Sequence, residues 1–490
     1  MNQNFKLLIV LLVAVNASIV GWLLLRPETA PSANLSQQAN VIDDLLKDNT
    51  MEAARYDLSA SADKLNVILI SLDALRYDRT GVSGNSKGLT PNLDAFADES
   101  VVFHDTTSAA PWTLPSHMSV WTGRWPSIHQ VTNKLAPLSG GKMVETSLSP
   151  GIQTYPDLLI RSGRTAGGFT GGAGVQNKYG FGRDFDRYLD DRYFGGLDYS
   201  IPAALEWVDD QGSDPFFLFL HGYDVHGQYP LAESKRSTLN YSGALNGSIE
   251  EQAGLREKGL ANIERPGAPA HLQGELNETD AAYLEDIYDL KVRDADERLG
   301  SFLTQIKTMG LYEQSIIIVF SDHGDEFMEH NGLDHGPTLY QEQLHVVSMI
   351  RFPSYGRRQD IHAPVRTIDL FPTVFDAIGL DGPARVDGMS LLPLLRGESM
   401  KLGVYAESDY RLFVHQRMGR EGDHKLILDL LDGKRELYNL NNDPGEKTDM
   451  SSKDPRRTYE MEQRLRRWMD ASKTNPQDYL GLEEEPISIF

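Results

Sequence analysis

Aspartate and histidine side chains follow three apolar segments of the sequence. Asp73 follows Asn66–Leu72, the group His221, Asp224 and His226 follows Pro215–Leu220, and the pair Asp322 and His323 follows Ser315–Phe320. A single aspartate after a strand is most often a turn or helix-cap residue, but three such segments together favour a shared site. Carboxylate and imidazole ligands, in a sequence without cysteine, suit one of four dications: Ca²⁺, Mg²⁺, Mn²⁺ or Zn²⁺.

Thr113 is a second candidate for chemistry, because it stands where a helix is expected to begin. Pro115 suits the first turn of a helix, and the helical pattern continues through Met118 to Trp121. A hydroxyl at a helix N-terminus lies in a positive potential, beside backbone N–H groups that can hold an anion. The alternative is that Thr113 is only the N-cap of this helix.

The elements that must position these residues alternate along the sequence. The three apolar runs have the length of strands and suit strands that are buried on both faces of a parallel sheet. Helices are expected between them over Thr90–Asp98, Tyr155–Arg161 and Ala281–Met309. We therefore predict an α/β fold with a large, mostly parallel (mixed) central sheet sandwiched by helices. Open sheets of this kind place their sites at the carboxyl ends of the strands.

The sequence changes character from about Gly397. Short strand candidates separated by turns, followed by a charged helix over Arg456–Asp470, predict a small C-terminal antiparallel sheet with a helix. Pro230–Thr279 is polar and irregular and is expected to form loops over one side of the larger domain. Gly167–Gly172 is expected to be a flexible loop, because no Lys-Ser/Thr pair follows it as in a phosphate-binding loop.

Leu7–Leu25 is almost wholly apolar and nearly long enough to span a bilayer core as a helix. The Arg-Pro-Glu that follows is a poor cleavage site, so a retained N-terminal transmembrane helix is favoured over a cleaved signal peptide. The catalytic domain is then expected to be exported, to the periplasm or another extracytoplasmic space. The expected domains are an anchor or signal (1–26), a linker with a membrane-proximal helix (27–63), a catalytic α/β domain (64–396) and a C-terminal subdomain (397–490).

Charge restricts the classes of partner. The 490 residues include 47 Lys+Arg and 70 Asp+Glu, which gives a formal net charge of −23. This balance argues against a nucleic-acid partner and against broad adhesion to anionic lipid headgroups, because both need a basic face. An anionic ligand must therefore be attracted locally, by a metal, a few basic residues or a helix N-terminus. The absence of cysteine excludes disulfides and thiolate catalysis.

Seven motifs, taken in order, resemble the sulfatase branch of the alkaline phosphatase superfamily over roughly residues 64–470. They are NVILISLDALRYD, TLPSHMSVWTG, PFFLFLHGYDVHGQY, IIIVFSDHGDEFMEH, LDHGPTLYQEQLHV, VDGMSLLPLL and RELYNLNNDPGEKTDM. The resemblance implies a metal-dependent hydrolase or transferase that acts on phosphoric or sulfuric esters. It also implies that Asp73, Asp322 and His323 are metal ligands and that His226 and His335 contact the substrate.

The sequence departs from the family pattern at four positions. Thr113 stands where sulfatases carry the Cys or Ser that is converted to formylglycine, and threonine has no route to that aldehyde hydrate. His117 replaces an Arg of the family, and Ala74 replaces the second Asp after the first strand. A second metal would need an acid four residues before His226, where the sequence has Gly222. We therefore expect one divalent metal ion, with histidines in the place of a second.

These departures, set against the family pattern, predict a covalent intermediate on Thr113. His335, or less readily His226, is expected to protonate the leaving oxygen. The helix N–H groups, His117 and His226 would hold the anionic group, and Arg124 is a candidate either for that role or for bracing the motif. Esterified threonine needs a second displacement, by water or an acceptor alcohol, which favours phosphate esters or diesters over sulfate esters. The expected metal ligands are Asp73, Thr113, Asp322 and His323.

Two alternative functions stay open at this point. One is a sulfatase proper, and the other is a catalytically degenerate member that binds an anionic group or a glycan. The expected partner is an anionic ester, whether a small molecule, a lipid headgroup or a glycan. His104 and His221 are expected to be structural. Asp325, Glu326 and Glu329 are expected either to lie around the site behind the ligands or to be solvated.

Overall fold

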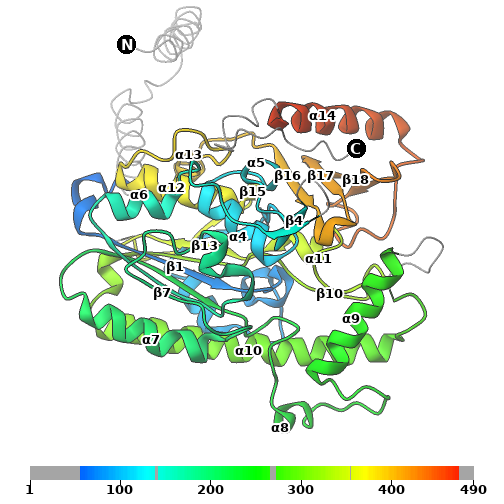
Figure 1. Cartoon of the computed structure of the whole chain (residues 1–490), viewed down its shortest axis with the longest axis horizontal. Helices are drawn as coiled ribbons and strands as arrows, with labels where there is room; N and C mark the ends of the chain where they lie inside the picture. Colours follow the sequence, from blue (N-terminus) through cyan, green and yellow to red (C-terminus); the bar gives the residue numbers. More distant parts are fainter. Residues whose placement is uncertain (1–55, 138–141, 265–271, 354, 474–490) are drawn as a thin grey trace, which may run out of the picture. The chain divides into compact units, whose positions relative to one another are not determined.

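The computed structural model describes residues 56–137, 142–264, 272–353 and 355–473. Their centre is an eight-stranded mixed sheet in which only one strand, β13, runs antiparallel to its neighbours (Figure 1). The α/β fold with a large mixed sheet is as predicted. The strand order is β14 (Gln359–Ile361), β2 (Val101–Phe103), β13 (Ser348–Arg351), β9 (Ser315–Phe320), β1 (Asn66–Leu72), β8 (Phe216–Gly222), β6 (Thr165–Phe169) and β7 (Arg187–Leu189).

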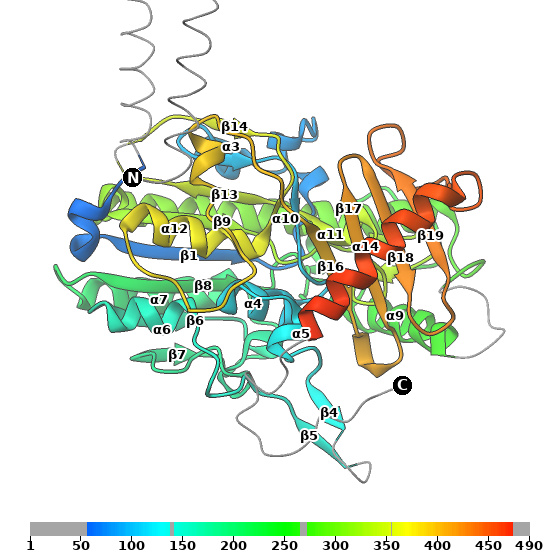
Figure 2. The same cartoon turned by 90° about the horizontal axis from the view of Figure 1, so that it is seen from above.

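Alternate residues of β1 pack into two separate cores. Val67 and Leu69 belong to the core formed with α4 (Thr113–Thr122), α6 (Tyr155–Arg161) and α12 (Leu370–Ile378). Ile68 and Ile70 belong to the core formed with α3 (Pro91–Ala97), α7 (Leu197–Asp210) and α10 (Glu278–Thr308). Figures 1 and 2 show α7 and α10 on one face of the sheet and α4 and α12 on the other. Burial on both faces explains why the central strands are continuous apolar runs.

The expectation that Pro230–Thr279 forms only loops was wrong. The segment contains α8 (Glu233–Arg236) and the 16-residue helix α9 (Ile249–Glu264). The signal for α9 is the Ser-x-x-Glu pattern at its start, which the polar composition obscured. Ser248 Oγ accepts the backbone N–H of Glu251 at 3.2 Å, and the Glu251 carboxylate in turn accepts the N–H of Gly247 at 2.7 Å.

The glycine run at 167–172 begins as the buried strand β6, and the prediction of a loop was wrong for this part. A Cβ at Gly167 would lie 2.7 Å from the Trp207 ring, and one at Gly168 would lie 2.3 Å from the Tyr188 ring. Glycine is present here because aromatic side chains pack directly on the strand backbone.

The predicted C-terminal subdomain has the expected layout. A four-stranded antiparallel sheet consists of β16 (Val404–Ser408), β17 (Gln416–Glu421), β18 (His424–Asp429) and β19 (Arg435–Asn439). The last helix, α14 (Pro455–Lys473), covers one face of this sheet (Figure 2) and packs Met461 and Leu465 against Leu426 and Leu428.

Short elements connect these units. Paired strands are β3 (Thr106–Thr107) with β12 (His345–Val346) and β15 (Val365–Arg366), β4 (Leu135–Pro137) with β5 (Met143–Glu145), and β10 (Glu326–Phe327) with β11 (Leu333–Asp334). Short helices are α5 (Pro126–His129), α11 (Gln341–Leu344) and α13 (Leu392–Leu395). Turns of 3₁₀ helix are Ser59–Lys64, Tyr77–Arg79, Gly81–Ser83, Ala173–Val175, Asn177–Tyr179, Tyr312–Gln314, Thr367–Asp369 and Tyr410–Leu412.

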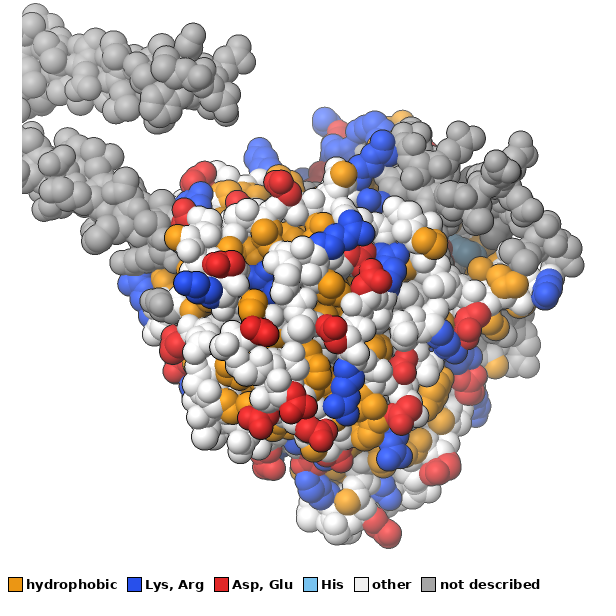
Figure 3. Space-filling model, turned by 60° about the vertical axis from the view of Figure 1, so that its left-hand side comes forward, with side chains coloured by type: hydrophobic (Ala, Val, Ile, Leu, Met, Phe, Trp, Pro, Cys, Tyr) orange, Lys and Arg blue, Asp and Glu red, His pale blue; other side chains and the backbone are white. Residues whose placement is uncertain are grey.

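Within the described ranges, no helix is both long enough and apolar enough to cross a membrane. The predicted anchor Leu7–Leu25 lies outside the described residues, so the anchor and the exported location stay predictions. The domain boundaries at 63/64 and 396/397 also stay predictions. On the face drawn in Figure 3, acidic and basic side chains are interspersed with apolar ones.

Candidate active site

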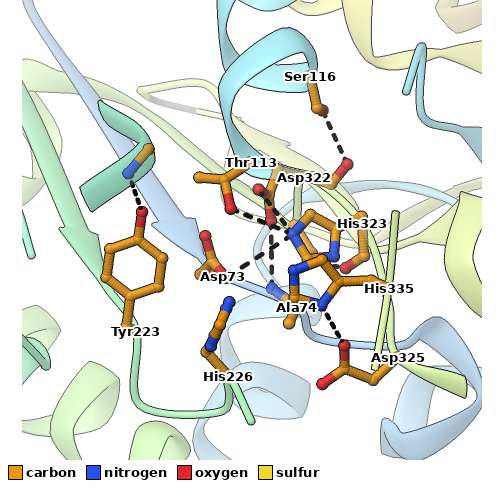
Figure 4. Close-up of polar contacts among 12 residues, drawn as sticks. Asp73, Ala74, Thr113, Ser116, Tyr223, His226, Asp322, His323, Asp325 and His335 are labelled. Carbon is orange, nitrogen blue, oxygen red and sulfur yellow. Dashed lines mark hydrogen bonds and ion pairs between the residues drawn. The ribbon is translucent and has the colours of Figure 1, made fainter. Parts of the chain in front are cut away.

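Two neighbouring strands bring three of the predicted metal ligands to one edge of the central sheet. Asp73 follows β1, and Asp322 and His323 follow β9, which pairs with β1 in parallel. One ligand atom from each of these buried side chains lies within 4.8 Å of the others. The N-terminus of α4 faces the group, and Oγ1 of Thr113 is 3.4 Å from Nε2 of His323. Figure 4 shows the four side chains turned towards one another.

Hydrogen bonds around this group leave the inward-facing atoms free to bind a cation. Nδ1 of His323 donates to the carbonyl oxygen of Gly324 at 3.0 Å, so Nε2 carries the lone pair. Oδ1 of Asp73 and Oδ2 of Asp322 are buried and accept no hydrogen bond from the described residues. Burial and the Asp322 carboxylate raise the pKa of Asp73 well above its usual range. The residues present therefore fit a divalent metal, whose charge would offset both carboxylates.

Two groups hold the other oxygens of the two carboxylates, and a third, His117, lies close to Oδ2 of Asp322 without a hydrogen bond to it. Nε2 of His221 is 3.2 Å from Oδ2 of Asp73, and the backbone N–H of Ala74 donates to Oδ1 of Asp322 at 3.1 Å. Nδ1 of His117 is 3.2 Å from Oδ2 of Asp322. Such contacts orient metal ligands in proteins, which gives His221, expected to be structural, a role beside the site.

His117 lies beneath the site instead of at the substrate surface. Its ring is fully buried, with Nδ1 2.9 Å from the carbonyl oxygen of Thr113 and Nε2 2.8 Å from Oγ of Ser71. The rings of Phe219 and Phe320 pack edge-on against it. His117 is therefore placed to hold Thr113 and its surroundings, and the structure does not bring it to the cavity that the substrate would enter.

Local backbone geometry fixes the direction of the Thr113 hydroxyl. Trp112 is extended, with φ −161° and ψ 161°, so helical geometry begins at Thr113. Gly174 packs on the opposite side of this residue, where a Cβ would lie only 2.8 Å from the Cβ of Thr113. The backbone N–H of Gly174 donates to the Tyr223 hydroxyl at 2.8 Å, which fixes that loop in place. The hydroxyl of Thr113 is thus held at a helix N-terminus, where an anion is favoured.

Two histidines, His226 and His335, stand beside the predicted metal ligands, with ring centroids 4.8 Å apart. Nδ1 of His226 accepts the backbone N–H of Gln228 at 3.1 Å, so the neutral ring carries its proton on Nε2. Burial lowers the pKa of His226 well below its usual value, and the neighbouring His335 lowers it further. A neutral imidazole with its proton on Nε2 donates a hydrogen bond from that atom and does not bind a cation through it.

His335, unlike the neutral His226, is held in its positively charged form. Its Nδ1 is 2.6 Å from Oδ1 of Asp325 and 2.7 Å from Oδ1 of Asp334. Burial alone lowers the pKa of His335, but the two carboxylates outweigh burial and raise it well above its usual value. Nε2 is then the nitrogen that is free to give a proton to a ligand.

Lys291 supports both histidines from α10. Its Nζ donates to the carbonyl oxygens of His226 and Gly227, each at 3.1 Å. Burial lowers the pKa of Lys291 to about 8, although Asp325 and Asp334 act to raise it. The lysine braces the loop that carries His226 and places a positive charge beside the two acids.

Asp224, which follows the second apolar run, is engaged by other protein groups. This carboxylate accepts the backbone N–H of Leu197 at 2.7 Å and forms an ion pair with Arg298. A further group, His323, Asp325 and His335, also has ligand atoms within 4.8 Å of one another. In that group, however, the Asp325 carboxylate is already taken by His335.

A cavity of about 570 Å³ opens over Thr113. Basic, aromatic and aliphatic side chains line it, and no Asp or Glu of the described ranges does. The lining residues are Trp112, Thr113, Asn133, Lys134, Leu135, Met143, Gly174, Tyr193, Phe194, Tyr223, His226, Gln228, Ala253, Arg256, His335, Tyr410, Arg411 and Leu412. The size and composition are those of a site for a small molecule or for one end of a larger one.

The structure does not bring Arg124 to the cavity. It follows α4, about 16 Å along the helix axis from Thr113, and its Nε donates to the carbonyl oxygen of Arg385 at 2.8 Å. Glu329, expected to lie around the site, pairs instead with Arg76 at 2.5 Å.

Several site residues were not expected from the sequence. In the sequence, Asp334 directly precedes His335 and Tyr223 directly precedes Asp224. This closeness to candidate residues was the only signal for them. Arg256 and Lys291 come from helices α9 and α10, and no local pattern marks them as different from other helical cations.

Comparisons with known proteins agree with the fold. The sulfatase family model matches residues 65–380, and a model of the C-terminal part of N-sulphoglucosamine sulphohydrolase matches residues 329–474. Because the first match covers more than half of the chain, the protein belongs to the sulfatase family, and it is a hydrolase that acts on ester bonds.

Individual relatives are distant but aligned over most of their length. Arylsulfatase K of Xenopus laevis is 21% identical over 88% of this chain and 87% of its own. A Δ4,5-hexuronate-2-O-sulfatase of Bacteroides thetaiotaomicron is 24% identical over 80% of this chain and 86% of its own. The solved phosphonate monoester hydrolase of Agrobacterium radiobacter shares the fold with a TM-score of 0.63, at 18% identity over 83% of this chain and 96% of that one.

Proposed function

We propose that this protein hydrolyses anionic monoesters through a covalent ester on Thr113, with phosphate esters preferred over sulfate esters. The observation that carries the proposal is the position of the Thr113 hydroxyl. It lies at the N-terminus of α4, faces a cavity, and is 3.4 Å from a histidine nitrogen whose lone pair points inward.

The proposed metal ligands are Asp73, Asp322, His323 and the hydroxyl of Thr113. A divalent metal held there would lower the pKa of that hydroxyl and neutralise charge on the ester. The imidazole ligand favours a transition metal such as Zn²⁺ or Mn²⁺ over Ca²⁺, which prefers an all-oxygen shell. Ala74 stands in place of a second carboxylate, so the site offers fewer oxygen ligands, which also favours Zn²⁺ or Mn²⁺ over Ca²⁺.

Each residue of the site then has its own role in the proposed reaction. Oγ of Thr113, whose hydroxyl proton passes to solvent, forms a bond to phosphorus or sulfur while the bond to the leaving oxygen breaks. Nε2–H of His335 gives its proton to that leaving oxygen. Nε2–H of His226 and the free N–H groups of α4 donate to the remaining anionic oxygens. In a second displacement, water forms a bond to phosphorus or sulfur while the bond to Oγ of Thr113 breaks. The attacking water gives a proton to the neutral His335, and Oγ of Thr113 regains a proton from solvent.

The preference for phosphate follows from the side chain at 113. A formylglycine hydrate carries a second hydroxyl whose loss of a proton expels sulfate, whereas a threonine ester has none and must be attacked by water. Sulfate ester hydrolysis is the second candidate, and family membership and the sulfatase relatives favour it. The phosphonate monoester hydrolase neighbour supports phosphorus chemistry on this fold only by analogy.

A substrate panel tests the proposal. The full-length protein is assayed with 4-nitrophenyl phosphate, bis(4-nitrophenyl) phosphate, 4-nitrophenyl phenylphosphonate and 4-nitrophenyl sulfate, each with Zn²⁺, Mn²⁺, Mg²⁺ or Ca²⁺. We expect the highest kcat/KM with the phosphate monoester and a loss of about 10³-fold or more in Thr113→Ala. Faster turnover of the sulfate than of every phosphorus ester would overturn the preference, and turnover that survives Thr113→Ala would overturn the mechanism.

A further inference from the structure

The cavity wall carries three basic side chains, although the chain as a whole has a net charge of −23. Lys134 comes from the segment leading into β4, Arg256 from α9, and Arg411 from the turn between β16 and β17. No acidic side chain of the described ranges lines the cavity with them. A local excess of positive charge in an acidic protein indicates that the cavity receives an anion.

The three cations differ in how far protein groups already satisfy them. The guanidinium of Arg411 is held by both carboxylate oxygens of Glu257, at 2.8 and 3.0 Å. Lys134 Nζ donates to the neutral Tyr193 hydroxyl at 3.2 Å, and the described residues supply no carboxylate partner for it. A carboxylate therefore offsets the charge of Arg411, whereas none of the described residues offsets that of Lys134.

Arg256 is anchored on one side and open on another. Its Nε lies 3.2 Å from Oδ2 of Asp334, and its Nη2 donates to the Tyr410 hydroxyl. These contacts fix the plane of the guanidinium and leave Nη1 with no hydrogen-bond partner among the described residues. A guanidinium held in this way is preorganised to donate to a carboxylate or phosphate-type oxygen.

The neighbouring lining is aromatic, which suits a ring in the substrate. Trp112, immediately before Thr113, packs edge-on against Tyr410, the hydrogen-bond partner of Arg256, with ring centroids 5.4 Å apart. Phe194 stacks on His226 at 4.7 Å. Both pairs include lining residues, so apolar ring faces lie in the same cavity as the catalytic hydroxyl and the guanidinium.

We propose that Arg256, assisted by Lys134, binds a second anionic group of the substrate. The preferred substrate is then a ring-containing monoester that bears an additional negative charge, either a carboxylate or a second ester group. This inference rests on the proposed function, because the first anionic group is the ester that Thr113 attacks.

The test compares matched ester pairs in the wild type and in two variants. The probes are 4-carboxyphenyl and 4-carbamoylphenyl phosphate, together with the corresponding sulfates, which differ in one negative charge at similar size. We expect the wild type to favour the carboxyl ester in kcat/KM. Arg256→Gln should reduce that preference by about tenfold or more and Lys134→Gln by a smaller factor. The control Arg187→Gln, an exposed residue of strand β7 that does not line the cavity, should keep the wild-type preference.

Arg256 could also affect turnover indirectly, by holding Asp334 and through it His335. The ester pairs distinguish this structural effect from substrate binding. If Arg256 only held Asp334 in place, Arg256→Gln would slow both esters equally and leave the preference unchanged, which would overturn the proposal. An unchanged preference in both variants would overturn it as well. Failure of the proposed function has a different signature, namely carbamoyl-ester turnover that does not depend on Thr113. Comparing 1,4-phenylene bis(phosphate) with the carboxyl ester then identifies which second anion is preferred.

Discussion

The hydroxyl of Thr113 and the imidazole of His323 lie 3.4 Å apart, although 210 positions separate them in the sequence. The helix α4 brings one residue and the end of β9 brings the other. The hydrogen bond from Nδ1 of His323 to Gly324 sets the tautomer that points a lone pair at the hydroxyl. This pair joins the proposed nucleophile to the proposed metal ligands.

Removing the charge of Asp322 should abolish tight metal binding. Oδ2 of this residue is buried without a hydrogen bond, so the amide of Asp322→Asn would leave the site one carboxylate short. In the wild type we expect one tightly bound ion per chain by elemental analysis and a rise in Tm on adding Zn²⁺. The variant should show neither, and the exposed control Asp214→Asn should show both. Equal metal content in Asp322→Asn and the wild type would contradict the assignment.

Replacing His226 should impair catalysis without affecting the metal. Because Nδ1 accepts the N–H of Gln228, the neutral ring has a donor at Nε2 and no lone pair there for a cation. His226→Gln should lower kcat/KM by about 10- to 100-fold while metal content stays at the wild-type level. The exposed His362→Gln is the control. Loss of the ion in His226→Gln would show instead that this histidine is a ligand.

Adding a single methyl group at Gly174 should displace the nucleophile. A Cβ there would lie 2.8 Å from the Thr113 Cβ, so either the loop or the threonine must shift. We expect Gly174→Ala to lower kcat/KM by about 10²-fold, because small misplacements at a reacting group are costly. Gly254→Ala on α9 meets open space and should leave kcat/KM unchanged. A Gly174→Ala enzyme as active as the wild type would mean that the packing of Gly174 does not position Thr113.

Glu326 should make folding stability depend on pH. Burial, followed by the nearby Glu342 carboxylate, raises the pKa of Glu326 to about 7 from 4.5. The folded state therefore binds more protons than the unfolded state between these values, and its stability falls as pH rises through this window. Glu326→Gln should stabilise the protein at pH 8 by up to about 3 kcal/mol and have little effect at pH 4.5.

Chemical unfolding at the two pH values measures this difference, with the exposed Glu206→Gln as the control. The same stability change at both values would contradict the proposed ionisation of Glu326.

The parts of the fold that could be predicted are those with a local signal. Asn66–Leu72 and Ser315–Phe320 are buried on both faces, so their sequences are continuous apolar runs, and each leads directly into a candidate ligand. The helix α9 was missed because its exposed face makes the segment polar, and only the capping pair Ser248 and Glu251 marks its start. Local patterns identify strands that are buried on all sides better than helices that are half in water.

The parts of the site that could not be predicted are set by tertiary contacts. Lys291 and Arg256 lie on α10 and α9, and nothing in the neighbouring sequence distinguishes them from solvated cations. His117 has the residue type of a catalytic group, but its ring is directed below Thr113 and not into the cavity. Arg124 shares a motif with Thr113, yet the length of α4 separates the two.

The most direct test of the central claim is to look for the intermediate on Thr113. The protein is mixed with an activated aryl phosphate or aryl sulfate, quenched in acid during turnover, digested and analysed by peptide mass spectrometry. The account predicts that the peptide containing Thr113 gains the mass of one phosphoryl or sulfuryl group at that residue, and that the adduct decays as product forms. The account would be contradicted if the wild type turned over substrate steadily with no adduct on Thr113 and if the Thr113→Ala variant kept that turnover.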